Sequence, residues 1–205
     1  MTAIYVDFKG AYDSVWRDKL YQKLLDIGIT SNLFNWIRSF TSQRTCRVKF
    51  GDSFSKCFNL QTGLPQGAVS CCTLFIIYIN DLVSALKSIP DIHCLLFADD
   101  LVIWTQAPKR NAKYRIENRL NKAKQVLSDW SNENTLTVNL EKTASQSFSL
   151  THETFRPKLQ YQNNLITNRD NFTYLGLTFD KKLSWRLHVD QLIQRVTNRF
   201  NVLKY

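Results

Sequence analysis

Glycine, proline, histidine and cysteine are all scarce in this chain of 205 residues. Six glycines and four prolines argue against long disordered tracts, and no internal repeat or low-complexity segment is present. The five cysteines are odd in number and lack a Cys-x-x-Cys spacing, and only three histidines accompany them. These counts exclude a disulfide framework and a zinc site, and they suit a reducing compartment.

Long apolar runs and acidic residues are also few. The longest uninterrupted apolar stretch, around residues 74–79, is far too short to span a bilayer, and no signal peptide precedes Asp7. Seventeen acidic residues stand against 27 Lys and Arg, which gives a net charge of +10. This bias favours a polyanionic partner, nucleic acid first and an anionic membrane surface second. The length allows one large domain, or one domain with an appendage.

Two adjacent aspartates interrupt an otherwise apolar stretch over residues 95–104. Asp99 and Asp100 lie between two runs of strand length, which predicts a tight β-hairpin with both carboxylates at its tip. Neighbouring carboxylates repel each other, so a site that keeps them together generally holds a cation as well. A solvated acidic turn is the alternative interpretation.

A third carboxylate, Asp7, ends the β-branched and aromatic run over residues 3–8. It has no capping role there, and a buried acid needs a partner. If this strand lies beside the hairpin, Asp7, Asp99 and Asp100 converge. Such a cluster can hold two divalent cations about 3.5–4 Å apart, the arrangement used for nucleotidyl transfer. Oxygen ligands favour Mg²⁺ or Mn²⁺.

Helical periodicity predicts five helices. Asp13 is expected to cap the first, which ends near Gly28, and the others are expected at 31–40, 68–86, 109–130 and from 185 onward. The helix at 109–130 has one apolar face, expected in the core. Its basic face, which includes Lys109, Lys122 and Lys124, is expected to be solvated.

The remaining segments are predicted to be strands and turns. Strands are expected at 44–50 and 57–60 around a turn at 51–52, then at 136–139, 144–150 and 171–179, with a polar hairpin at 155–165. A Gly-Leu-Pro-Gln-Gly loop at 63–67 places Gln66 at a helix entrance. This position suits nucleotide recognition, and a simple turn before a core helix is an equal alternative. Lys142, in a turn, has functional meaning only if it faces the aspartates.

Five motifs in this order resemble the palm of a reverse transcriptase of the non-LTR, LINE-like, jockey-type retrotransposons. The resemblance is carried by Asp7-Phe8-Lys9-Gly10-Ala11-Tyr12-Asp13, by Gly63–Gly67 with 73–75 and 78–81, by Phe97-Ala98-Asp99-Asp100, by Asn139–Thr143, and by Tyr174-Leu175-Gly176 with 182–188. It implies an α+β fold in which residues 1–180 form the palm, a mainly antiparallel sheet backed by helices. Residues 181–205 would begin a thumb-like helix.

The resemblance also implies roles for individual residues. Asp7, Asp99 and Asp100 would be the catalytic metal ligands for two Mg²⁺ or Mn²⁺ ions, with the Phe8 carbonyl as a further ligand. Tyr12 would act as a steric gate that favours deoxynucleotides, Gln66 would contact the incoming nucleotide, and Lys142 would approach the pyrophosphate. Tyr174, Leu175 and Gly176 would form the primer grip.

The partners implied by the resemblance are an RNA template, a DNA primer, a dNTP and the rest of a retrotransposon polyprotein. The location implied is intracellular, in the cytoplasm and nucleus as an element ribonucleoprotein, without a membrane anchor.

The chain departs from the family pattern in two respects. Cys71-Cys72 occupies positions where the family usually has Ser-Pro, which is expected to alter the helix entrance. The chain also begins within a strand and ends within a helix, so we expect a fragment without fingers and with a truncated thumb. An inactive remnant that only binds nucleic acid is one alternative. An RNA-making polymerase is another, and Tyr12 argues against it.

Overall fold

A five-stranded sheet forms the centre of the molecule in the computed structural model, which describes residues 1–108, 110–150 and 155–203. The strand order is β11-β8-β1-β7-β6. β1 (Thr2–Val6) lies between β7 (Asp100–Thr105) and β8 (Ala144–Ser147), and β6 (His93–Phe97) follows β7 at the edge; these pairs are all antiparallel. Among the described strands, β11 (Thr167–Asn168) alone pairs in parallel. The predicted α+β class with a mainly antiparallel sheet is therefore confirmed.

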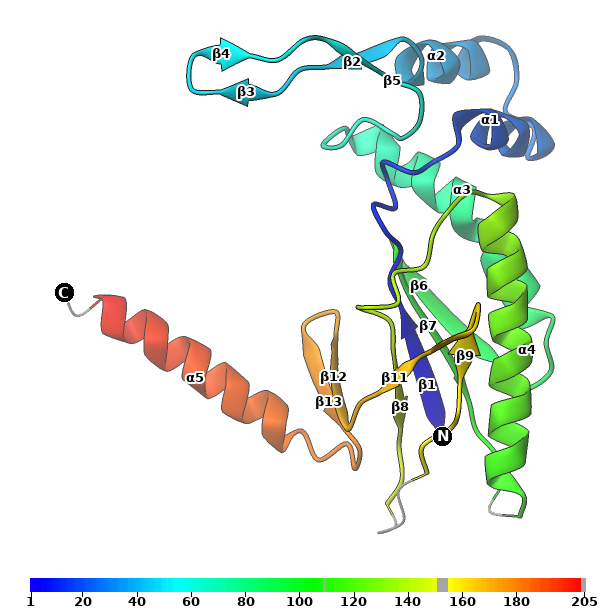
Figure 1. Cartoon of the computed structure of the whole chain (residues 1–205), viewed down its shortest axis with the longest axis vertical. Helices are drawn as coiled ribbons and strands as arrows, with labels where there is room; N and C mark the ends of the chain where they lie inside the picture. The colour runs from blue at the N-terminus through cyan, green and yellow to red at the C-terminus, as the bar shows by residue number, and fades with distance from the viewer. Residues whose placement is uncertain (109, 151–154, 204–205) are drawn as a thin grey trace.

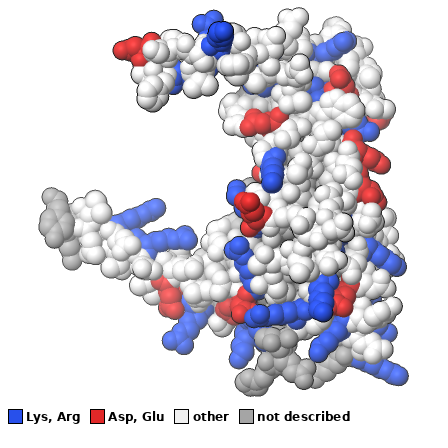
Figure 2. Space-filling model, viewed as in Figure 1, with Lys and Arg blue, Asp and Glu red and all other residues white. Residues whose placement is uncertain are grey.

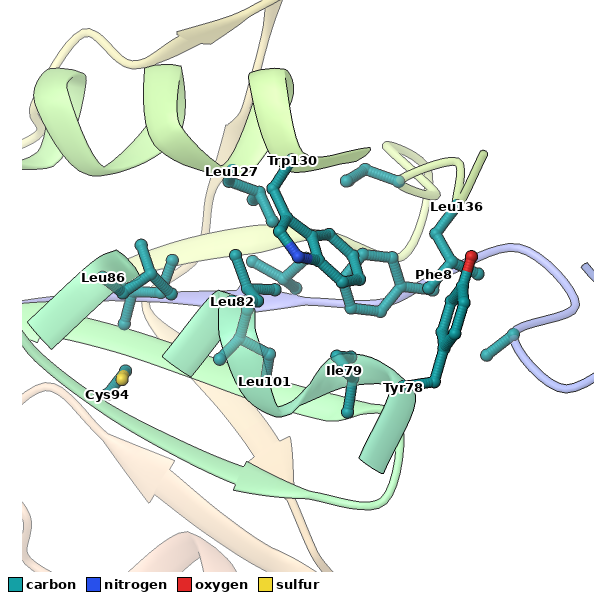
Figure 3. Packing of buried hydrophobic residues seen from close by; sticks show 14 of the residues in the cluster. Phe8, Tyr78, Ile79, Leu82, Leu86, Cys94, Leu101, Leu127, Trp130 and Leu136 are labelled. Carbon is teal, nitrogen blue, oxygen red and sulfur yellow. The ribbon is translucent and has the colours of Figure 1, made fainter. Parts of the chain in front are cut away.

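Two helices cover one face of this sheet. α3 (Val69–Lys87) and α4 (Ala112–Glu133) pack against it, and the main core cluster lies between them and the sheet (Figure 1). Figure 3 shows Trp130, Phe8 and Tyr78 in this core, and the Trp130 ring centroid lies 6.4 Å from that of each of the other two rings. Because strand side chains alternate, β1 supplies every second residue to this core. The core thus fixes the strand that leads to Asp7.

A hairpin covers the opposite face of the sheet. β12 (Asn171–Tyr174) and β13 (Leu177–Asp180) pair antiparallel, and the Phe172 ring stacks on Tyr5 with centroids 4.2 Å apart. Ala3, Tyr5 and Val102 form a second small apolar cluster with this hairpin. Aromatic stacking of this kind adds about 0.5–1.5 kcal/mol beyond area burial. It fixes the hairpin beside the end of β1.

The remaining elements lie outside this layered centre. They are α1 (Arg17–Asp26), α2 (Ser31–Thr41), β2 (Arg44–Cys46), β3 (Lys49–Phe50), β4 (Ser53–Phe54), β5 (Phe58–Leu60), β9 (Gln160–Tyr161), β10 (Asn164–Leu165) and α5 (Arg186–Leu203). β2–β5 and α5 project from the same side of the sheet, one from each end (Figure 1). The five predicted helices and the hairpin predicted at 155–165 are confirmed.

Three local predictions are wrong. Residues 171–179 do not form one strand, because β12 and β13 pair antiparallel around a turn at Leu175 and Gly176. Asp13 does not cap a helix, because α1 begins only at Arg17 and its N-cap residue, Trp16, makes no side-chain capping bond. Residues 136–139 form no strand but a single bridge between Val138 and Phe8. Val138 lies beside Phe8, beyond the end of β1 at Val6. No residue of β1 is therefore left there to extend the pairing.

The expectation that no apolar segment is long enough to span a bilayer also needs correction. α3 has 19 residues and a mean hydropathy of 1.8, so by length and composition it could cross a membrane. The uninterrupted apolar run at residues 74–79 covers only part of this helix. Seven of its residues, Cys71, Leu74, Phe75, Tyr78, Ile79, Leu82 and Leu86, are buried in the core. Its apolar character is therefore explained by packing against the sheet.

Lys124 is buried, contrary to the prediction that the basic face of α4 is solvated. Only 4% of the residue is exposed, and its ammonium donates to the carbonyl of Gln160 in β9. The β9–β10 hairpin packs on this side of the helix, which the helix periodicity alone does not reveal. Burial lowers the pKa of Lys124 to about 8. Lys122 is exposed as predicted, and Lys109 lies outside the described residues.

Lys124→Met is expected to stabilise the fold at pH 7 by about 1–3 kcal/mol, because it keeps the apolar stem and removes a buried charge that forms no ion pair with a described residue. In the wild type, the pKa falls on folding from 10.5 to about 8. The unfolded state therefore binds more protons between these values, and stability rises as the pH increases through them. Urea unfolding at pH 7 and pH 10 measures both effects. A variant less stable than the wild type at pH 7 would contradict this account.

Candidate active site

The three predicted carboxylates lie at one end of the central strands, where β1 ends and β7 begins. Val6 pairs with Leu101, so Asp7 and Asp100 stand at the same end of neighbouring strands. Asp100 also pairs with Phe97 across a two-residue turn made of Ala98 and Asp99. The predicted hairpin with both aspartates at its tip is thus present. Ala98 adopts a φ of 52°, and such strain, of order 1 kcal/mol for a residue with a Cβ, persists only where flanking strands hold it.

The electrostatics of Asp100 show that the three carboxylates interact. Burial raises its pKa, and the negative charges of Asp99 and Asp7 raise it further. Both neighbours disfavour a third negative charge at this end of the strands. A cation here would reverse that effect, because it neutralises the mutual repulsion.

Tyr12 faces the same end of the strands. Its ring stacks on Phe75 of α3 with centroids 4.5 Å apart. Burial, a hydrogen bond with the Cys72 thiol and the charge of Asp99 together raise its pKa to about 12. One cysteine of the unusual Cys71-Cys72 pair therefore contacts the candidate steric gate, while Cys71 is buried in the core.

Lys142 faces the aspartates. A functional role for this lysine depended on that orientation. Its Nζ lies 3.9 Å from Asp7 Oδ1, and the side chain is 71% exposed. The turn that carries it is fastened to the end of β1, because Asn139 N donates to the Asp7 carbonyl at 2.7 Å and Asp7 N donates to Thr143 Oγ1 at 3.2 Å. An exposed pair of this kind contributes little to stability, so the ammonium is free to turn toward an anionic ligand.

The candidate primer grip lies beside these groups. The Tyr174 hydroxyl donates to the Asp100 carbonyl at 3.2 Å. A cavity of about 210 Å³ is lined by Asp7, Asp100, Lys142, Tyr174 and Leu175, among others. Leu175 and Gly176 form the turn between β12 and β13 with φ values of 48° and 81°. The structure therefore gathers residues from four separate motifs around one cavity.

Gln66 lies elsewhere, against the Tyr12–Arg17 turn. Its Nε2 is 2.9 Å from both carboxylate oxygens of Asp13. Leu64 N donates to the Tyr12 carbonyl at 2.9 Å, so the loop at 63–67 and the backbone of the candidate gate are joined directly. This pairing could not be predicted, because nothing in the local sequence links residue 13 to residue 66.

Arg17 is a second residue that sequence reasoning missed. It is buried, and its guanidinium donates to the carbonyls of Gly63 (3.0 Å), Leu60 (2.9 Å) and Thr62 (2.6 Å). A buried charge held by several hydrogen bonds is costly to disrupt. Arg17 therefore fixes the loop that carries Gln66. No sequence signal distinguishes it from a surface arginine in the first turn of a helix.

The chemistry of the donor atoms fits a divalent cation. In the part of the chain that the structure describes, no group of three His, Cys, Asp or Glu side chains is close enough together to hold a metal ion. Asp7, Asp99 and Asp100 supply the hard oxygen ligands that Mg²⁺ and Mn²⁺ prefer. Burial raises the pKa of Asp100 and the charges of Asp99 and Asp7 raise it further, so a bound cation would lower the cost of ionising all three groups.

Known proteins resemble this chain in sequence and in fold. It is 25% identical over 195 residues to the RNA-directed DNA polymerase from mobile element jockey of Drosophila melanogaster, covering 93% of this chain and 21% of that protein. It is also 25% identical to the probable RNA-directed DNA polymerase from transposon BS of the same organism, covering 99% of this chain and 22% of that one. The chain thus spans about a fifth of the length of these relatives.

Solved structures agree on the fold. Apo telomerase from Candida tropicalis superposes with a TM-score of 0.62 at 18% identity, covering 90% of this chain and 34% of that one. Telomerase from Candida albicans gives a TM-score of 0.61 at 15% identity, covering 89% and 30%. Residues 2–179 match the sequence profile of the family described as reverse transcriptase (RNA-dependent DNA polymerase). The chain therefore belongs to the reverse transcriptase family.

Proposed function

We propose that this chain carries the catalytic palm of an RNA-directed DNA polymerase from a non-LTR retrotransposon, with residues 1–180 as the palm and 181–205 as the start of a thumb-like helix. A primer 3′-hydroxyl attacks the α-phosphate of a dNTP, and pyrophosphate leaves. The observation that supports the proposal most is that Asp7, Asp99 and Asp100 lie where β1 ends and β7 begins, with Lys142 beside Asp7 and Tyr174 beside Asp100. Membership of the family supports the same chemistry.

The candidate site residues have distinct roles in the proposed reaction. Asp7, Asp99 and Asp100, with the Phe8 carbonyl as a further ligand, would hold two divalent cations, which would supply charge stabilisation for the attacking and leaving oxygens. Lys142 orients the pyrophosphate and donates a proton to it. Tyr174, Leu175 and Gly176 seat the primer terminus. For Gln66 to contact a nucleotide, its amide must leave the Asp13 carboxylate.

The proposed partners are an RNA template, a DNA primer, a dNTP and the remaining parts of a retrotransposon polyprotein. The net charge of +10 favours the nucleic acids, and the relatives are polymerases of mobile elements. The proposed location is that of the element ribonucleoprotein, in the cytoplasm and nucleus.

Primer extension tests the proposal directly. The purified chain is incubated with an RNA template, an annealed DNA primer, the four dNTPs and Mg²⁺. We expect extension that requires both the metal and the template. Template binding without any extension would contradict the enzymatic proposal for this chain, and it would support the alternative of a nucleic-acid-binding remnant.

Tyr12→Ala is expected to reduce the preference for dNTP over rNTP by about ten- to a hundredfold, because the ring would otherwise occupy the space of a ribose 2′-hydroxyl. Single-nucleotide incorporation of dTTP and UTP measures the ratio. Tyr12→Phe is the matched control, because it keeps the ring that stacks on Phe75 and removes only the hydroxyl. If Tyr12→Ala retained the wild-type ratio, the steric-gate assignment would be wrong. A wild type that prefers UTP over dTTP would instead favour the RNA-making alternative.

A further inference from the structure

An exposed arm, residues 44–60, has no part in the core or in the carboxylate site. β2 pairs with β5, and β3 pairs with β4 at the tip. Three phenylalanines along the arm are exposed: Phe50 by 88%, Phe54 by 62% and Phe58 by 56%. Scattered exposed apolar residues are ordinary, but three aromatic rings on one narrow hairpin are not.

The arm is also basic. It carries Arg44, Arg47, Lys49 and Lys56 against a single acid, Asp52. None of these four cations forms an ion pair with a residue that the structure describes. They are therefore available to an external anion. A protein partner with a purely apolar surface would leave all four without compensation.

Cations and rings alternate along the tip of the arm. Lys49 pairs with Phe54, and its Nζ lies 5.7 Å from the centre of that ring. Strand alternation places Phe50 on the opposite face, so the tip presents an aromatic ring on each side. Basic charge interleaved with exposed rings is the chemistry that binds single strands, since phosphates meet the cations and unpaired bases stack on the rings.

The arm is also placed so that a nucleic-acid strand could run from it to the carboxylate site. It and α5 both project from the same side of the sheet, and the end of β1 that leads to Asp7 lies between them (Figure 1). Figure 2 shows the molecule hollowed on this side, with blue atoms along both projections. Residues 186, 195 and 199 of α5 are arginines. The hollow is thus bordered by positive charge on both sides.

We infer that the arm binds single-stranded nucleic acid, with Arg47 and Lys49 on phosphates and Phe50 and Phe54 stacked on bases. A duplex is disfavoured, because its bases are already stacked on each other and closed to the rings. The arm thus adds a second contact with the RNA template of the proposed polymerase. Only the identity of the bound strand as that template rests on the proposed function. Binding itself needs neither the carboxylates nor a metal.

Fluorescence anisotropy of a labelled 20-nucleotide RNA, measured in EDTA and without dNTP, tests this inference apart from catalysis. The double variant Phe50→Ala, Phe54→Ala is expected to weaken binding by about tenfold or more, because each stacked base contributes strongly. The salt dependence should keep the wild-type slope. Arg47→Gln, Lys49→Gln should instead reduce that slope by about 1.4, from about 0.7 per lost phosphate contact. A labelled DNA strand and an RNA duplex of equal length complete the comparison.

Tyr114→Ala is the matched control. Tyr114 is 70% exposed and stands between Lys113 and Arg115, in the first turn of α4, at the other end of the molecule from the arm. Its loss should leave the affinity unchanged. Absence of RNA binding by the wild type, equal affinity of the Phe50→Ala, Phe54→Ala variant, an equal effect of Tyr114→Ala, or a preference for duplex would each overturn the inference. Equal affinity of the double variant would point to a protein surface for the arm instead.

Discussion

Asp99→Asn is expected to reduce RNA-templated primer extension by about a hundred- to a thousandfold, the loss typical when one element of a preorganised electrostatic site is removed. Asn keeps the size and shape of the side chain and removes its charge. Asp99 lies in the turn between β6 and β7, outside the core, so the fold does not depend on it. The pKa of Asp100 should fall in the variant, because the charge of Asp99 helps to raise it. Extension rates at saturating dTTP and Mg²⁺ measure the loss.

The matched control is Asp26→Asn, at the end of α1, where an exposed aspartate lies apart from the carboxylate site. It should extend primers at the wild-type rate. Equal rates for Asp99→Asn and the wild type would remove the assignment of Asp99 as a catalytic ligand. Equal losses in the two variants would show that the effect is unspecific.

Gly63→Ala is expected to lower the free energy of unfolding by about 2–4 kcal/mol, through backbone strain and overlap together. Gly63 has a φ of +83°, and an added Cβ would lie 2.7 Å from the Asp13 carbonyl oxygen and 2.9 Å from its Cα. Backbone atoms cannot move aside as a flexible side chain can. The substitution should therefore separate the Gln66 loop from the turn that carries Tyr12. Urea unfolding followed by circular dichroism gives the free energy.

Gly28→Ala separates the two contributions. Gly28 has nearly the same φ, +84°, but an added Cβ would meet nothing within 4 Å. Its replacement should cost only about 1 kcal/mol, from the positive φ alone. If both variants lost the same stability, the close approach of Gly63 to Asp13 would have no energetic weight, and the coupling between the two loops would not hold.

β1 and the β6–β7 hairpin could be predicted from the sequence because their signals are local. An apolar run that ends in an aspartate predicts a buried strand with Asp7 at its C-terminal end. The Asp99–Asp100 hairpin follows from the same kind of pattern. The seven-residue motif at 7–13 then places Tyr12 at a fixed distance from the first carboxylate. These features need no knowledge of what packs against them.

Other features depend on tertiary contacts and have no local signal. Arg17 and Lys124 look like surface cations on amphipathic helices, yet the loop ending at Gly63 and the β9–β10 hairpin bury them. Asp13 precedes a helix and so resembles a cap, but it pairs with Gln66, 53 residues away. Which segment covers a helix face is decided by the global fold, so the helix pattern alone gives the wrong partner.

The central claim is that Asp7, Asp99 and Asp100 act together as a binding site for divalent cations. Titration of the purified chain with Mn²⁺, followed by the electron paramagnetic resonance signal of the free ion, measures this without reference to catalysis. The account predicts saturable binding to the wild type that weakens about tenfold or more in Asp7→Asn, Asp99→Asn and Asp100→Asn alike, because each removes one charged ligand. Wild-type affinity in all three variants would contradict it.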